Sequence, residues 1–372
     1  HDPMVLHGST WLVLTLGSAA QSPGSSWLFL ALLDSWIGTV LFFFVVVAGL
    51  QTRSSSSSVV IGSKPEFFLL DPRHNRIILL WHSSQPCRSL TLVTAVSLLF
   101  SVMLPLISLL GIQVTSVYTN IQAEVNVIFF TFFSFGLLGL YDDLKKFFGF
   151  KKEKFFGMRL KYKFLIQWIL ALIIAYLLYN QLGISFLHVP FFGTLPLGIL
   201  YIPFAAFTIV AFANAVNITD GLDGLASGVL LISLFGLWFL SYTILDTVLS
   251  LFITLWIGSL IAFIYFNIYP ARIWMGDVGA LSFGATFAVV GLLLGKSVAL
   301  PVIGGVFVLE ITTSMIQLLS KRFMGKKFFP VAPFHLWLQL RGWEETKIVQ
   351  RTWIASLVLM LFGVWMAIIY KT

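Results

Sequence analysis

Acidic side chains are scarce in this chain, and several of them gather in short polar segments. The first segment, residues 139–146 (GLYDDLKK), closes an apolar stretch with the adjacent pair Asp142 and Asp143. The carboxyl end of a helix carries partial negative charge, so two carboxylates are unfavourable there unless a cation compensates them. Mg²⁺ is a suitable cation, because it binds one or two carboxylates together with phosphate oxygens. Alternatively, Lys145 and Lys146 balance the pair on a solvated helix end.

A second polar segment, residues 214–228 (NAVNITDGLDGLASG), carries an amide or a carboxylate at every third position. Asn214, Asn217, Asp220 and Asp223 follow this spacing, which is close to one face of a helix. Four such groups on one face could hydrogen-bond a nucleoside or a hydrated ion. Alternatively, Asp220 or Asp223 is the N-cap of a following helix. That arrangement explains one of the four residues.

The third segment, residues 265–280 (YFNIYPARIWMGDVGA), places Asp277 among glycines directly before an apolar stretch. Such an Asp is either an N-cap or a metal ligand on a tight turn. Trp274 precedes it by three residues. Its indole could stack on a nucleobase, although tryptophan is also a common anchor at the membrane interface.

A fourth segment, residues 332–345 (APFHLWLQLRGWEE), lies in a strongly basic region and contains His335. An isolated histidine is more often structural than catalytic, and the aromatic residues around it indicate an interfacial helix. A basic belt precedes the second segment, over residues 145–163. It could orient the chain and attract anionic lipid, or gather polyphosphate substrates. Lys163 is its strongest candidate for a functional contact.

The composition identifies the kind of scaffold that holds these segments. Of 372 residues, 58% are hydrophobic and only 10% are charged, and the mean hydropathy is +0.95. A soluble globule could not bury so much apolar surface, and neither a disordered chain nor a coiled coil has this composition. The single cysteine, Cys87, excludes a disulfide framework. We therefore predict an all-α integral membrane protein.

About ten apolar stretches are long enough to cross a bilayer. All but two of the 23 Lys and Arg residues then fall in alternate loops, which the positive-inside rule assigns to the cytoplasm. The pattern predicts both termini outside and all four polar segments at the cytoplasmic face. The expected spans lie near residues 27–50, 91–112, 126–141, 164–182, 194–213, 225–244, 247–267, 279–295, 298–319 and 352–370.

Taken together, the four polar segments and the tail LRGWEETKIVQRTWI closely resemble the motifs of the phospho-N-acetylmuramoyl-pentapeptide-transferase family, in order and in spacing. The resemblance runs from about residue 126 to the C-terminus. This family belongs to the polyprenyl-phosphate N-acetylhexosamine-phosphate transferases. The resemblance implies a multi-pass protein of the bacterial cytoplasmic (inner) membrane that serves peptidoglycan synthesis. It also implies a possible homodimer.

The resemblance implies a reaction in which UDP-MurNAc-pentapeptide and undecaprenyl phosphate give lipid I and UMP, with Mg²⁺ as cofactor and no nucleic acid partner. Asp277 matches the metal-binding aspartate of the family, and Asp142 and Asp143 match its paired aspartates, one of which is a candidate base or a group that positions the lipid phosphate. Lys163 and His335 match further catalytic positions. The implied substrate-binding positions are Lys146, Asn214, Asn217, Asp220, Asp223, Asn267 and Trp274.

The chain also departs from the family pattern. Leu336 and Trp337 replace the second and third residues of a His-His-His run, Gln339 replaces a Glu, and Ala280 replaces a Ser. Residues 1–90 lack the expected motif of the first inside loop, so we predict a divergent region over residues 1–90 and a transferase core over residues 91–372.

Two other functions stay open on the sequence alone. One is a transferase that uses a UDP-N-acetylhexosamine for another surface polymer, although the RGWEE tail argues against it. The other is a membrane transporter or an inactive homologue. A transporter predicts acids near mid-membrane, and Glu310 in the ninth stretch is the main such residue, with Asp34 similar in the first.

Overall fold

The computed structural model describes residues 70–71, 76–77, 119–148, 160–190, 192–244 and 246–369. The first two expected spans, residues 27–50 and 91–112, lie outside these residues. Nearly all of the predicted divergent region over residues 1–90 also lies outside them, so the division into two regions stays a prediction.

The described part is almost entirely helical. Two short antiparallel pairs of strands accompany the helices: β1 (Leu70–Asp71) with β2 (Arg76–Ile77), and β3 (Phe186–Val189) with β4 (Gly193–Pro196). A 3₁₀ turn, η1 (Gly198–Leu200), leads into α6. The α-helices are α4 (Thr119–Phe148), α5 (Leu160–Asn180), α6 (Tyr201–Thr219), α7 (Leu225–Thr243), α8 (Thr247–Asn267), α9 (Gly276–Leu293), α10 (Leu300–Ile303), α11 (Gly305–Phe323), α12 (Phe334–Leu340) and α13 (Glu345–Ile368).

Seven helices among the described residues are long and apolar enough to cross a membrane. They coincide with seven of the expected spans, which confirms a mostly helical, multi-pass membrane protein. α4 extends at both ends beyond the expected stretch of residues 126–141. The total of ten spans and their orientation stay predictions.

The expected span of residues 298–319 is divided into α10 and α11, which meet at Gly304. A Cβ at this position would lie 2.9 Å from the ring of Phe212 and 3.1 Å from that of Phe287, so the break falls where the chain passes close to two aromatic side chains. α11 is not among the seven apolar spans, since it carries Glu310 and ends with Lys321 and Arg322.

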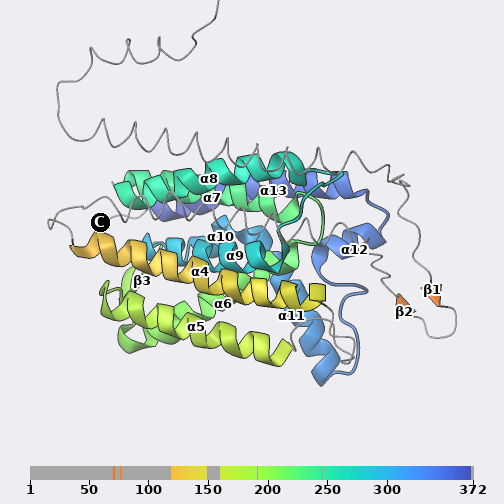
Figure 1. The fold of residues 1–372 in the computed structure, drawn as a ribbon, viewed down its shortest axis with the longest axis horizontal. Coiled ribbons are helices and arrows are strands. Elements are labelled where there is room, and N and C mark those ends of the chain that lie inside the picture. The colour runs from red at the N-terminus through yellow and green to blue at the C-terminus, as the bar shows by residue number, and fades with distance from the viewer. Residues whose placement is uncertain are drawn as a thin grey trace, which may run out of the picture.

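α9 is the centre of the helix packing. Every residue from Val278 to Leu292 is buried, because α4 and α6 pack closely against this helix. Figure 1 shows α4 running beside α9. α5 packs on α6, and α7 packs on both α8 and α13. The outer helices α5 and α13 expose many large apolar side chains, as expected for surfaces that face lipid.

Candidate active site

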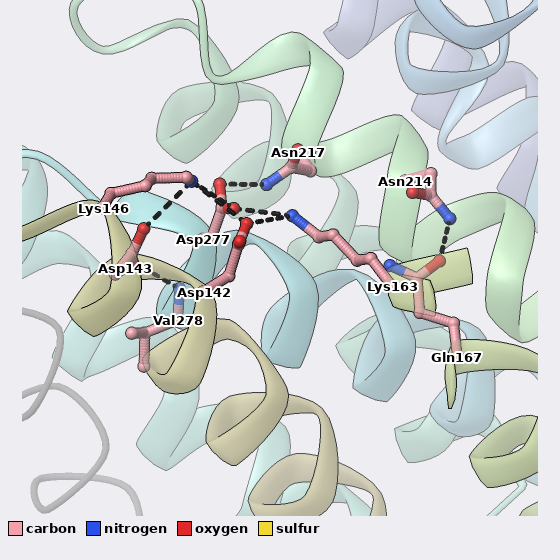
Figure 2. Close-up of polar contacts among 9 residues, drawn as sticks. All are labelled: Asp142, Asp143, Lys146, Lys163, Gln167, Asn214, Asn217, Asp277 and Val278. Carbon is pink, nitrogen blue, oxygen red and sulfur yellow. Dashed lines mark hydrogen bonds and ion pairs between the residues drawn. The ribbon is translucent and has the colours of Figure 1, made fainter. Parts of the chain in front are cut away.

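The ends of α4, α5, α6 and α9 bring together six polar residues that lie far apart in the sequence (Figure 2). α4 supplies Asp142, Asp143 and Lys146. α5 supplies Lys163, α6 supplies Asn217, and α9 supplies Asp277. We call these six residues the carboxylate–lysine cluster. All of them are among the predicted functional residues.

Asp277 is at the centre of the cluster. Its Oδ2 atom accepts hydrogen bonds from the ammonium groups of Lys146 and Lys163, each at 2.6 Å. Its Oδ1 atom accepts a hydrogen bond of 2.9 Å from the side-chain amide of Asn217. The carboxylate is thus held from three helices, in a geometry that Figure 2 shows directly.

Asp142 and Asp143 complete the cluster from α4. Asp142 is only 3% exposed, and its Oδ2 atom lies 2.9 Å from the Lys163 ammonium and 3.2 Å from that of Lys146. Asp143 lies 3.3 Å from the Lys146 ammonium and accepts a 3.2 Å hydrogen bond from the Val278 backbone N–H. The pair is therefore partly buried and engaged by two other helices, rather than placed on a solvated helix end.

The approach of α4 to α9 depends on a glycine. A Cβ added at Gly139 would overlap the backbone carbonyl of Asp277. The absence of a side chain lets the two helices touch one turn before the aspartate pair. This contact places Asp143 within reach of the first turn of α9.

The capping alternative for Asp277 is wrong. The N-cap of α9 is Met275, and Asp277 lies within the first turn. The partial positive charge of the helix N-terminus favours a carboxylate there. Because the side chain does not cap the helix, both of its oxygens are directed at groups from other helices.

The cluster has the donor chemistry of a site for a hard cation. Three carboxylates reach the single ammonium of Lys146 at 2.6–3.3 Å, so their oxygens face one region. When all three are ionised, the two lysines leave one negative charge uncompensated. The described residues contain no preformed group of three or more His, Cys, Asp or Glu ligands. The residues fit Mg²⁺ in its usual binding mode, with one or two carboxylates and oxygens from a phosphate.

The predicted stripe of four polar residues is divided by the end of α6 at Thr219. Only Asn214 and Asn217 are on the helix. Asn214 donates to Gln167 Oε1 at 2.7 Å and to the Val210 carbonyl at 2.8 Å. The geometry thus places Asn217 in the cluster and Asn214 against α5.

Asp220 and Asp223 lie in the loop that joins α6 to α7. The capping alternative is wrong for both, because the N-cap of α7 is Gly224, whose φ of 78° lies in the left-handed region that favours glycine. Asp220 lies close to the backbone of Gly276, the residue before Asp277. Burial, together with the nearby charges of Asp277 and Asp143, raises the pKa of Asp220 to about 7.

Asp223 connects the loop to the segment before α9. Its carboxylate accepts hydrogen bonds from the Ala271 backbone N–H at 2.8 Å and from the Trp274 indole at 3.1 Å. Its own N–H donates to Glu345 Oε1 at 2.9 Å. Two of the predicted substrate-binding residues, Asp223 and Trp274, therefore bond to each other.

Asn267, another predicted substrate-binding residue, is buried at the end of α8. Its side chain donates to the Ile273 carbonyl at 2.9 Å and accepts a 2.6 Å hydrogen bond from the Ser227 hydroxyl. It shapes the turn that carries Trp274 and the start of α9.

His335, at the start of α12, is buried beside the α6–α7 loop. A Cβ on Gly221 would lie 2.5 Å from the His335 Nε2 atom, so the ring packs against this glycine. The other ring nitrogen, Nδ1, lies 3.1 Å from Glu310 Oε2. The geometry thus joins His335 to α11 and to the loop, and Lys163 rather than His335 contacts the central aspartate.

Sequence reasoning missed two residues that support these groups. Gln167 is fully buried in α5 and holds Asn214. It follows Lys163 by four residues, and an amide in an otherwise apolar span was a usable signal. Glu345 holds Asp223 and belongs to the RGWEE tail, but only the family match indicated that this tail was functional.

Comparison with known proteins gives a consistent set of relatives. Residues 125–295 match the family described as Glycosyl transferase family 4. The chain is 39% identical over 257 residues to a phospho-N-acetylmuramoyl-pentapeptide-transferase of Aquifex aeolicus, covering 64% of this chain and 70% of the relative. An enzyme of the same name from Staphylococcus saprophyticus is 36% identical over 268 residues, covering 70% and 83%. One from Rickettsia canadensis is 38% identical over 254 residues, covering 63% and 70%.

Proposed function

Because the chain belongs to the phospho-N-acetylmuramoyl-pentapeptide-transferase family, we propose that its carboxylate–lysine cluster is the catalytic centre for lipid I synthesis. In this reaction a phosphate oxygen of undecaprenyl phosphate attacks the sugar-bearing phosphorus of UDP-MurNAc-pentapeptide. The bond from that phosphorus to the bridging oxygen breaks, and UMP leaves. The observation that carries the proposal is the convergence of Lys146 and Lys163 on Asp277.

The main obstacle to this reaction is repulsion between anions. The attacking phosphate is already ionised near pH 7, so little help from a general base is required. Lys146 and Lys163 provide two fixed positive charges in a site with limited access to water. Charges held in place before the reaction stabilise the negative charge that develops in the transition state.

The residues that would hold Mg²⁺ are Asp277 and one member of the Asp142–Asp143 pair. When bound, the ion supplies positive charge to the diphosphate and to the departing UMP. Asn217 orients the Asp277 carboxylate through its 2.9 Å hydrogen bond. The other aspartate of the pair remains to position the lipid phosphate, and Lys146 would exchange its carboxylate contacts for contacts with phosphate.

The α6–α7 loop and Trp274 form the nucleotide side of the proposed site. Asp223 fixes the indole through a 3.1 Å hydrogen bond and so holds a flat aromatic face on which a base can stack. Asp220 lies close to the backbone of Gly276, the neighbour of Asp277, so this loop approaches the cluster. His335, on α12, contacts the same loop at Gly221.

The arrangement supports a cytoplasmic active site in the bacterial inner membrane. The residues of the cluster and the loop come from three stretches, residues 142–163, 214–224 and 268–278, that the distribution of Lys and Arg assigns to one side of the membrane. In the structure the α6–α7 loop approaches the cluster, because Asp220 lies close to Gly276, the residue before Asp277. A homodimer stays a prediction from the family resemblance.

The proposed donor can be tested by measuring UMP release from purified protein in detergent, with undecaprenyl phosphate and Mg²⁺. We expect release with UDP-MurNAc-pentapeptide and little with UDP-N-acetylglucosamine. The reverse preference would assign the chain to synthesis of another surface polymer. No release with either donor from folded protein would contradict the proposal.

A further inference from the structure

A buried acid–imidazole pair joins α11 to α12. Glu310 is 1% exposed and His335 is 3% exposed. Glu310 Oε2 lies 3.1 Å from His335 Nδ1, and the two carboxylate oxygens lie 3.2 and 3.4 Å from the His335 backbone N–H. One carboxylate therefore fixes both the ring and the backbone of the histidine.

This geometry determines which ring nitrogen faces the α6–α7 loop. An ionised carboxylate accepts hydrogen bonds only, so Nδ1 carries a proton when it bonds to Glu310. The opposite nitrogen, Nε2, lies against Gly221, in the loop that carries Asp220 and Asp223. Because residue 221 is a glycine, the Nε2 edge of the ring can lie this close to the backbone of the loop.

We propose that Glu310 is a positioning residue: it holds His335 so that Nε2 donates a hydrogen bond to an anionic oxygen of the donor substrate. Phosphate and carboxylate oxygens accept hydrogen bonds and do not donate them, so the contact requires a proton on Nε2 as well as on Nδ1. The resulting imidazolium needs a compensating charge in a buried place. Glu310 supplies it at 3.1 Å. This inference rests on the proposed function.

The local charges agree with this arrangement. Another acid near the ring is Glu345 of α13, whose carboxylate interacts with His335 at longer range but is bonded to the Asp223 backbone. In this chain the positions after His335 are Leu336 and Trp337. Of these three consecutive positions, His335 alone offers an imidazole for the proposed contact, with Glu310 as its bonded carboxylate.

Glu310→Gln keeps the size of the side chain and removes its charge. We expect it to raise KM for UDP-MurNAc-pentapeptide about tenfold, as expected for the loss of a charge-assisted hydrogen bond, with kcat changed less than about threefold. Thr313→Ala is the matched control, because the Thr313 hydroxyl donates to backbone carbonyls of its own helix, α11. Glu310→Asp should recover part of the affinity.

A purely structural role predicts a different result. In that case Glu310→Gln would lower the amount of folded protein and leave KM unchanged, which would overturn the proposal. The double variant Glu310→Gln with His335→Asn should be no worse than His335→Asn alone, since both changes remove the same contact. If the losses caused by the two single changes multiply in the double variant, this result would also contradict the proposal.

Two further measurements define the contact. Inhibition by UDP distinguishes which anionic group His335 binds. Glu310→Gln weakens inhibition if a phosphate is bound, and leaves it unchanged if a peptide carboxylate is bound.

Ring ¹⁵N NMR of labelled histidine, assigned with His335→Asn, should show a proton on Nδ1 in the free protein. A proton on Nε2 alone would refute the proposal. Failure of the proposed function is recognised separately, because the wild-type protein would then release no UMP.

Discussion

Lys163 and Asp277 are 114 residues apart in the sequence, yet Nζ of the lysine lies 2.6 Å from Oδ2 of the aspartate. The same ammonium lies 2.9 Å from Asp142. One lysine at the start of α5 thus joins the aspartate of α9 to the aspartate pair of α4. The pairing neutralises part of the charge that the substrates would otherwise meet.

Replacing this lysine should remove most of the activity. We expect Lys163→Met to lower kcat about a hundredfold or more, the usual effect of deleting one preorganised charge stabiliser. Lys161→Met is the control, since Lys161 is exposed on the same helix, and should stay near wild type. Equal losses in the two variants would indicate a general effect of charge.

Gly139→Ala should weaken the contact of α4 with α9. The added Cβ overlaps the Asp277 backbone, and overpacking of this kind costs on the order of 1–3 kcal/mol. We expect a lower midpoint of thermal unfolding together with reduced UMP release. Ser134→Ala on the same helix should change neither. An unchanged midpoint for Gly139→Ala would show that the helices are farther apart than described.

Asp223→Ala should loosen the segment that carries Trp274. Two hydrogen bonds to the carboxylate are lost, from Ala271 and from the indole. We expect KM for the UDP donor to rise about tenfold, as the indole is no longer fixed. The KM for undecaprenyl phosphate is the internal reference and should stay the same. A rise in KM for undecaprenyl phosphate alone would contradict this prediction, because it would place Asp223 on the lipid side of the site.

Asp220 should make stability depend on pH when no divalent cation is present. Its pKa is raised from 3.8 to about 7, so between these values the folded protein holds a proton that the unfolded chain has released. The contribution of the Asp220 carboxyl to the stability of the fold is fully present below about pH 4 and is lost as the pH rises through 7. Asp220→Asn should therefore raise the unfolding temperature above that of wild type, and this increase should be larger at pH 8 than at pH 5. The same difference at both pH values would refute this.

The sequence was sufficient to predict the membrane class and the polar segments, because hydropathy and the positions of Lys and Arg are local properties. Seven described helices match expected spans, and Asp142, Asp143, Lys163 and Asp277 do meet. The family match rested on the same segments. Their functional roles stay proposals.

The partners of these residues could not be predicted, since they depend on how distant helices pack. Nothing local indicates that Glu310 bonds to His335, 25 residues later, or that Gln167 holds Asn214. The predicted stripe failed at Asp220 and Asp223 because α6 ends at Thr219. A regular spacing continues through a loop, whereas the helix that would align it does not.

The most direct test of the catalytic centre is lipid I formation by wild type and by Asp277→Asn, each measured with Mg²⁺ and with EDTA. Asp246→Asn is the control, because Asp246 is the N-cap of α8, and asparagine also caps helices well. We predict Mg²⁺-dependent product formation in wild type and in the control, with at least a hundredfold loss in Asp277→Asn. Full activity of folded Asp277→Asn, or equal activity in EDTA, would contradict the assignment of this cluster as the catalytic centre.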